Sequence, residues 1–271
     1  MDMLDNETAL WVECSILFFG REKQFAQLLK RHGTALAVLQ SFGKRVDQSA
    51  VQRILADCRE NGIDIITQTD RRFPSTFFAA GSPVLFYAKG DSSCLSHAKT
   101  AGIIGARKAA GYSLRVCDDI TRQLVQNGLV IVSGFAKGID RCAHTSCLKA
   151  GGKTVAVLGC GIGTPYPKGS LALQSDIAKS GVVISEYPPL TPPKPENFPR
   201  RNRLIAALSD KLLVVEASGK SGCLNTVNHA LQQGKDVYVL PPYDIKSESC
   251  QGQAALIRDG AQIAFEASDL L

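Results

Sequence analysis

The stretch KTAGIIGARKAAGYSLRVCDDITRQLVQNGLVIVSGFAKGIDRCAHTSCLKAGGKTVAVLG, residues 99–159, alternates apolar runs with amphipathic segments. The apolar runs are AGIIG (101–105), LVIVS (129–133) and KTVAVLG (153–159), and helical periodicity separates them near 112–127 and 139–150. Apolar, β-branched runs of this kind predict strands buried on both faces, and the helices between them predict βαβ units. The fold class that follows is α/β, a doubly wound parallel sheet of the Rossmann-like type.

The same alternation continues towards the C-terminus with one interruption. The further predicted strands are VVISE (182–186), KLLVVEA (211–217) and DVYVL (236–240), with helices near 169–180, 200–209, 221–233 and 253–259. The interruption is YPPLTPPKPENFP (187–199), whose prolines favour an extended conformation. We therefore expect a sheet of six or more strands.

The N-terminal part has a different pattern. Short amphipathic segments separated by glycines predict helices at Glu7–Phe19, Arg21–His32, Thr34–Ser41 and Ser49–Asn61. We expect a small helical (SAM-like) domain over 1–70, a connector to the edge of the large domain over 71–98, and the Rossmann-like domain over 99–271. The helical domain could be a packing or dimerisation appendage, or a helix-hairpin-helix-like DNA contact, and the sequence leaves both readings open.

Composition sets weaker limits. The net charge of +6 suits a polyanionic partner but does not demand one. The nine cysteines include no CxxC pair, so we expect reduced core thiols in a reducing compartment. Cys142, His144 and Cys147 lack a fourth ligand, and we expect no metal. The N-terminus has no basic leader and no apolar run approaches the ~20 residues of a membrane span. We therefore expect a soluble, cytoplasmic protein.

In such a sheet, ligands bind outside the carboxyl ends of the strands, so the loops there carry the functional prediction. GARK (105–108) places two cations beside a helix N-terminus, where an anion fits. SGFAKGID (133–140) offers glycine turns, Lys137 for a phosphate and Asp140 as an expected N-cap. GCGIGTP (159–165) lacks the third glycine of a dinucleotide fingerprint, which argues against a dinucleotide-dependent oxidoreductase.

NFPRRNR (197–203) places three arginines at the start of a predicted helix, where cations are unfavourable. An external anion would resolve this conflict. The alternative is that the arginines pair with Glu186, Glu196 or Glu216.

SGKSGCLNT (218–226) contains the GKS triplet of a P-loop. The Walker spacing would need glycine where Val214 stands, so we expect no ATP hydrolysis.

Together these motifs, with ISEYPP, LVVEA and ALQQGKDVYVLP in the same order, resemble the DNA-processing protein A (DprA/Smf) family over about 100–262. The resemblance implies a homodimer that binds single-stranded DNA, protects it and loads a RecA-type recombinase in natural transformation. It implies DNA contacts at Gly105, Arg107, Lys137, Arg200, Arg201, Asn202 and Arg203, with Ser221, Gly222 and Thr226 shaping the pocket.

The chain departs from the family pattern at three positions. Ala106 stands where serine is usual, Pro242 where glycine is usual, and Ala254 where asparagine is usual. These departures put the ligand geometry near the last strand in doubt. We also expect no C-terminal winged-helix domain, which many members carry.

The main alternative is a nucleotide-processing enzyme, a LOG-like phosphoribohydrolase on the same type of sheet. Its PGGxGTxxE motif is absent, and the nearest equivalent, residues 218–230, contains no carboxylate. We therefore expect no enzymatic activity, no catalytic residue and no cofactor. The aromatic residues that could meet bases are Phe135, Tyr166, Tyr187 and Phe198, although each could equally be core.

Overall fold

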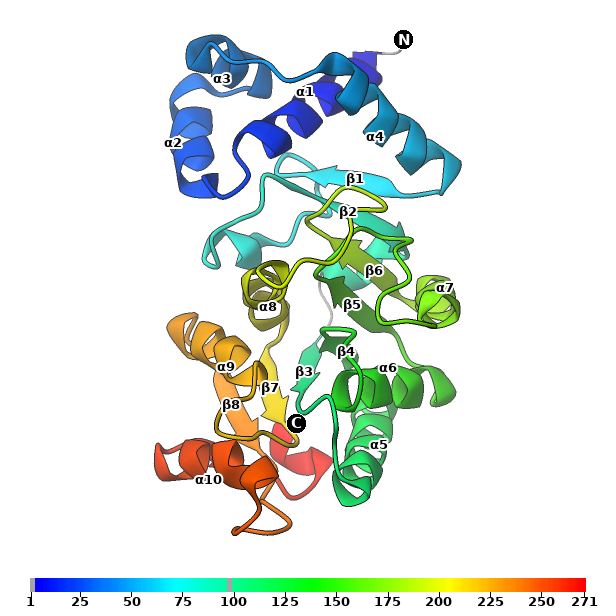
Figure 1. Ribbon diagram of the computed structural model, residues 1–271, viewed down its shortest axis with the longest axis vertical. Coiled ribbons are helices and arrows are strands. Elements are labelled where there is room, and N and C mark those ends of the chain that lie inside the picture. The colour runs from blue at the N-terminus through cyan, green and yellow to red at the C-terminus, as the bar shows by residue number, and fades with distance from the viewer. Residues whose placement is uncertain (1–2, 97–98) are drawn as a thin grey trace.

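The computed structural model describes residues 3–96 and 99–271 and builds them around one nine-stranded sheet (Figure 1). The strands are β1 (Asp64–Thr67), β2 (Leu85–Gly90), β3 (Thr100–Ile104), β4 (Val130–Ser133), β5 (Thr154–Leu158), β6 (Val182–Ser185), β7 (Lys211–Val214), β8 (Asp236–Val239) and β9 (Gln262–Ile263). Their order in the sheet is β1-β2-β6-β5-β4-β3-β7-β8-β9.

The strands from β3 to β9 are parallel to one another, and β1 and β2 add an antiparallel edge. The chain moves outward from β3 through β4 and β5 to β6, and then returns to place β7 on the other side of β3. This reversal is a topological switch point, where helices on opposite faces diverge and leave a crevice.

Helices cover both faces of the sheet. The helices after β3 are α5 (Gly111–Gln126), α6 (Ile139–Lys149), α7 (Leu171–Ser180), α8 (Asn197–Leu208), α9 (Cys223–Gln232) and α10 (Gln251–Arg258). Buried residues of α5 and α6 pack with Ile103, Ile131 and Leu213, whereas those of α8 and α9 pack with the alternate strand residues. Alternate residues of a strand face opposite sides, so the strands read as continuous apolar runs. The predicted α/β doubly wound fold is confirmed.

Four N-terminal helices form the blue end of the molecule in Figure 1, namely α1 (Met3–Leu17), α2 (Glu22–His32), α3 (Ala35–Phe42) and α4 (Gln48–Glu60). Trp11, Phe18 and Phe25 are buried between them. Their cluster continues into β2, β5 and β6, so this helical layer rests on one end of the sheet. In the part of the chain that the structure describes, no helix has the length and apolarity to cross a membrane.

Two details differ from the sequence-based expectations. The segment predicted as a connector contains β2, which pairs with β6 on one side and with β1 on the other, so this segment is part of the sheet. The division into domains stays a prediction. Helix α8 begins at Asn197, three residues before the predicted start, with Pro199 in its first turn. Proline is tolerated there because the first-turn N–H groups have no intrahelical acceptor.

Candidate nucleic-acid interface

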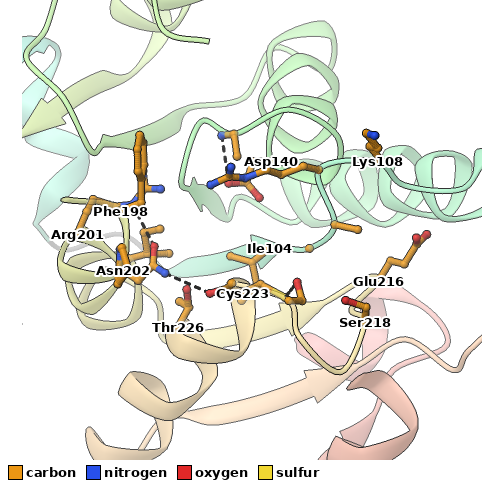
Figure 2. A pocket seen from close by; sticks show the side chains of 18 of the residues that line it. Ile104, Lys108, Asp140, Phe198, Arg201, Asn202, Glu216, Ser218, Cys223 and Thr226 are labelled. Atoms are coloured by element: carbon orange, nitrogen blue, oxygen red, sulfur yellow. Dashed lines mark hydrogen bonds between the residues drawn. The ribbon is translucent and has the colours of Figure 1, made fainter. Parts of the chain in front are cut away.

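Two adjoining cavities lie at the carboxyl ends of the strands. The larger, about 730 Å³, lies over the switch point between the loops that follow β3 and β7 (Figure 2). The smaller, about 460 Å³, lies beside it over the loops that follow β4 and β5. Both are lined by Arg107, Ala136, Tyr166, Phe198 and Arg201, so they share one wall.

Most of the residues predicted from the sequence meet at these cavities. The larger one is lined by Gly105, Arg107, Arg201, Asn202, Ser221, Gly222 and Thr226, and the smaller one by Lys137. In Figure 2, Phe198, Arg201 and Asn202 project from α8 on one side, and Glu216 and Ser218 lie on the other. Arg200 and Arg203 line neither cavity.

The cations of the strand-end loops are available to a ligand. Arg107, Lys108 and Lys137 are exposed, and among the described residues none of them has an ion-pair partner. The Arg107 guanidinium carbon lies 5.8 Å from the centre of the Phe198 ring. Lys168, also exposed, lines the smaller cavity. Unpaired cations around a concave surface attract an anion such as a phosphate.

Arg201 is buried and is held by the protein itself. Its guanidinium donates hydrogen bonds to the carbonyl oxygens of Gly134 and Val157, and Nε donates to Asn202 Oδ1 at 3.2 Å. Burial lowers its pKa to about 10, while the nearby carboxylate of Asp140 opposes that shift. Arg201 therefore stays charged at neutral pH and fixes the ends of β4 and β5 in place.

Asp140 was expected as the N-cap of its helix, and this prediction is wrong. The N-cap of α6 is Gly138, and Asp140 is the second helical residue. Its buried carboxylate accepts a hydrogen bond from Ala136 N at 3.2 Å, and burial raises its pKa against the effect of Arg201. A Cβ at Gly134 would lie 2.8 Å from Asp140 Oδ2 and 2.9 Å from Arg201 Nη2, so only glycine fits between these two groups.

The other two arginines of the NFPRRNR segment form ion pairs. Arg203 makes two hydrogen bonds to the buried Glu186 carboxylate, at 3.0 and 2.6 Å. Arg200 pairs with Glu22 from α2, lies 3.5 Å from Glu186 and covers the Phe19 ring at 4.1 Å. Of the three glutamates considered, Glu186 is thus the one that pairs with these arginines. The positive charge of Arg200 and Arg203 at the start of α8 is therefore balanced within the protein, without an external anion. DNA contacts at Arg200 and Arg203 stay a prediction.

Glu216 lines the larger cavity without pairing with these arginines. Its Oε2 accepts a hydrogen bond from Ala110 N at 2.9 Å, next to the start of α5, where a carboxylate is favourable. Asp140 was expected only as an N-cap and Glu216 only as a partner of the arginines, so their place in the cavity wall was not predicted. Lys168 was also missed, since it lies in a loop without any motif.

The aromatic candidates separate into two kinds. Tyr166 and Phe198 are partly exposed, their ring centres lie 5.3 Å apart, and both line both cavities. Phe135 is 4% exposed but also lines the smaller cavity, whereas Tyr187 is 3% exposed, lines neither cavity and belongs to the core. Of the three departures from the family pattern, only Ala106 lines a cavity; Pro242 and Ala254 do not.

A doubly wound sheet with a cation-rimmed cavity at its switch point, and without a dinucleotide fingerprint or Walker spacing, defines a Rossmann-like protein that binds a phosphate-bearing ligand. Residues 64–271 match the family model described as DNA recombination-mediator protein A. The chain belongs to this family.

Individual relatives agree with the assignment. The DNA processing protein DprA of Bacillus subtilis is 36% identical over 219 residues, which cover 80% of this chain and 73% of the relative. The structure of DNA processing protein A from Streptococcus pneumoniae is 32% identical, with a TM-score of 0.77 over 88% of this chain and 81% of that one. The structure of DNA processing protein A from Helicobacter pylori, reported for its single-stranded DNA binding mode, is 30% identical, with a TM-score of 0.69 over 77% of this chain and 93% of that one.

Proposed function

We propose that this protein binds single-stranded DNA across the strand ends of its sheet and delivers the strand to a RecA-type recombinase in natural transformation or recombination. The observation that carries the proposal is a set of exposed cations, Arg107, Lys108 and Lys137, that have no ion-pair partner among the described residues. They surround two cavities that share the Tyr166–Phe198 wall. Cations that follow phosphates, together with aromatic side chains that meet bases, are the two components of single-strand binding.

The shape of the site favours single strands over duplex. A cavity with aromatic walls can accept a base only when that base is unstacked and unpaired. The exposed cations Arg107, Lys108 and Lys137 come from loops at the sheet edge, and not from a helix face of the kind that enters a major groove. Cations that contact phosphates carry no sequence information, so we expect weak sequence preference.

Relatives supply independent support. The Helicobacter pylori protein, which shares the fold, is described as a single-stranded DNA-binding protein, and the Bacillus subtilis relative as a DNA processing protein. We extend the proposal to a homodimer that acts in the cytoplasm.

A second candidate is hydrolysis of a nucleotide, because Asp140 and Glu216 line the larger cavity. Both carboxylates are almost fully buried and accept hydrogen bonds from backbone N–H groups, which assigns them a structural role. We propose that the protein is not an enzyme. Hydrolysis of ATP or a nucleoside monophosphate above background, lost in Asp140→Asn, would support the enzyme instead.

The experiment that tests the main proposal is a salt-dependent titration with single- and double-stranded oligonucleotides of equal length. We expect tighter binding to the single strand, with log affinity falling against log salt by roughly 0.7 per neutralised phosphate. Equal or tighter binding to duplex at the same salt contradicts the proposal.

A further inference from the structure

Two exposed tyrosines, Tyr112 and Tyr243, lie together outside the cavities. Their side chains are 44% and 43% exposed, and their ring centres lie 6.0 Å apart with an interplanar angle of 54°. Tyr112 is the second residue of α5, which follows β3, and Tyr243 is in the loop that follows β8. Both thus follow the carboxyl ends of parallel strands, so this tyrosine pair is on the same sheet edge as the cavities.

The tyrosine pair adjoins the larger cavity. Tyr243 Oη shares a hydrogen bond of 2.9 Å with Ser249 Oγ, and Ser249 lines that cavity. Lys108, four residues before Tyr112, lines it as well. The pair therefore adjoins the larger cavity where Lys108 and Ser249 line it.

Charge near the pair favours a polyanion on one side. Residues 105–115 contain Arg107, Lys108 and Arg115 and no acidic residue. Arg115 is exposed, and its Nη1 lies 3.6 Å from where a Cβ on Gly111 would be, next to Tyr112. The segment after Tyr243 is instead slightly acidic, because it contains Asp244 and Glu248 but one cation, Lys246. A DNA backbone would therefore pass the start of α5, before Asp118 and Asp119, with its bases turned towards Tyr243.

The two tyrosines differ from the other exposed aromatic residues in being paired with each other. Phe19, Phe78 and Phe265 are exposed as well, at 44%, 57% and 71%, but among the described residues Tyr112 and Tyr243 are the one ring pair whose two members are both exposed. Adjacent exposed rings at the rim of a binding cavity are the arrangement on which successive unpaired bases stack, because every base has a π-face.

We propose that Tyr112 and Tyr243 form a stacking platform for the bases of a single strand that leaves the larger cavity, with Lys108 and Arg115 beside its phosphates. The inference rests on the proposed single-stranded DNA binding and adds a second contact region to it. It predicts a binding site longer than the cavities alone.

The test is fluorescence anisotropy of the full chain with oligothymidylates of about 4 to about 16 nucleotides, the range of site sizes known for single-strand-binding folds. The variant is the double substitution Tyr112→Leu and Tyr243→Leu, which keeps apolar bulk and removes the π-faces. The control is Tyr112→Phe with Tyr243→Phe, which keeps the rings and removes the hydroxyls. Thermal unfolding of each variant checks that the fold is retained, as expected for side chains this exposed.

We expect the leucine variant to bind the longest strands about 5- to 100-fold more weakly, the shortest strands normally, and with an unchanged salt slope because no cation is lost. The phenylalanine control should bind like the wild type. Unchanged affinity for long strands, or a loss that is equal at all lengths, overturns the platform. So does a change in sedimentation mass of the leucine variant with unchanged DNA affinity, which would assign the pair to a protein interface. Failure of the wild type to bind any single strand would instead refute the proposed function itself.

Discussion

Two groups of cations at the same end of the sheet differ in what surrounds them. Arg107, Lys108 and Lys137, in the loops after β3 and β4, are exposed and unpaired within the described part of the chain. The arginines of α8 instead have partners within the protein. Arg200 and Arg203 pair with glutamates, and Arg201 donates hydrogen bonds to backbone carbonyl oxygens. A basic motif therefore shows that charge is present at this end of the sheet, but not that the charge is available to a ligand.

The difference has an energetic basis. The ion pair between Arg203 and Glu186 is 11% and 5% exposed, and removing one partner from such a pair leaves an uncompensated buried charge. A solvated cation contributes little to folding, since water already satisfies it. Substitutions in the two groups should therefore affect different measurements, stability for α8 and binding for the loops.

The largest expected effect is that of Arg201→Ala. It leaves the carbonyl oxygens of Gly134 and Val157 without their donor and Asp140 without its neighbouring cation. We expect a loss of about 3–5 kcal/mol in the free energy of unfolding, measured by urea denaturation. Arg201→Lys should recover part of this loss, because it restores the charge but not the fork of donors. Wild-type stability in Arg201→Ala would mean that Arg201 belongs with the loop cations.

A pH measurement probes the same buried region through His144. Its Nδ1 lies 2.7 Å from Thr154 Oγ1, and burial, aided by the charge of Arg201, lowers its pKa from 6.5 to about 3. Between these values the unfolded chain takes up a proton that the folded protein does not, so His144 makes stability fall as the pH falls, by at most about 1.4 kcal/mol per pH unit.

The measurement is the free energy of unfolding of wild type and His144→Gln at several pH values. Other groups titrate in both proteins, so the difference between the two slopes isolates His144. We expect a shallower dependence in the variant between pH about 6.5 and about 3. Identical slopes would show that the imidazole becomes protonated in the folded state, and hence that this region is open to water.

Arg203→Ala should have an intermediate effect. Among the described residues, Glu186 would keep Arg200, at 3.5 Å, as its one ion-pair partner, so we expect a loss of about 1–3 kcal/mol in the free energy of unfolding. The double-mutant cycle with Glu186→Gln measures the coupling directly. A coupling near zero, together with weakened DNA binding by Arg203→Ala, would place Arg203 among the ligand contacts.

The strands and helices after residue 99 could be predicted because parallel strands buried on both faces are continuous apolar runs, and each run here is separated from the next by a clear helical period. The prediction also brought Arg107, Lys137 and Arg201 to one edge. It could not give the pairing of Arg200 with Glu22, since these residues are 178 positions apart. Nor could it assign β1 and β2 to the sheet, because β2 pairs with β6, a strand far away in the sequence, and β1 joins the sheet only through β2.

The smallest effect on stability is expected for the loop cations. Arg107→Ala and Lys137→Ala should each change the free energy of unfolding by less than about 0.5 kcal/mol, because both side chains are exposed. Each should nevertheless weaken single-strand binding by about 1–2 kcal/mol and make the salt dependence shallower by about one phosphate. A suitable control is Lys179→Ala, which removes one exposed cation from the last turn of α7, the end away from the cavities.

Because the control changes the net charge by the same amount, it separates a local contact from a general loss of attraction. If all three variants lose affinity equally, the protein binds DNA through its overall charge and the cavities are not the site. If the loop variants lose affinity at an unchanged salt slope, the two side chains shape the cavities without neutralising phosphates. If cations at the strand ends neutralise the phosphates of a DNA backbone, the Arg107 and Lys137 variants alone should show both a lower affinity and a shallower salt dependence.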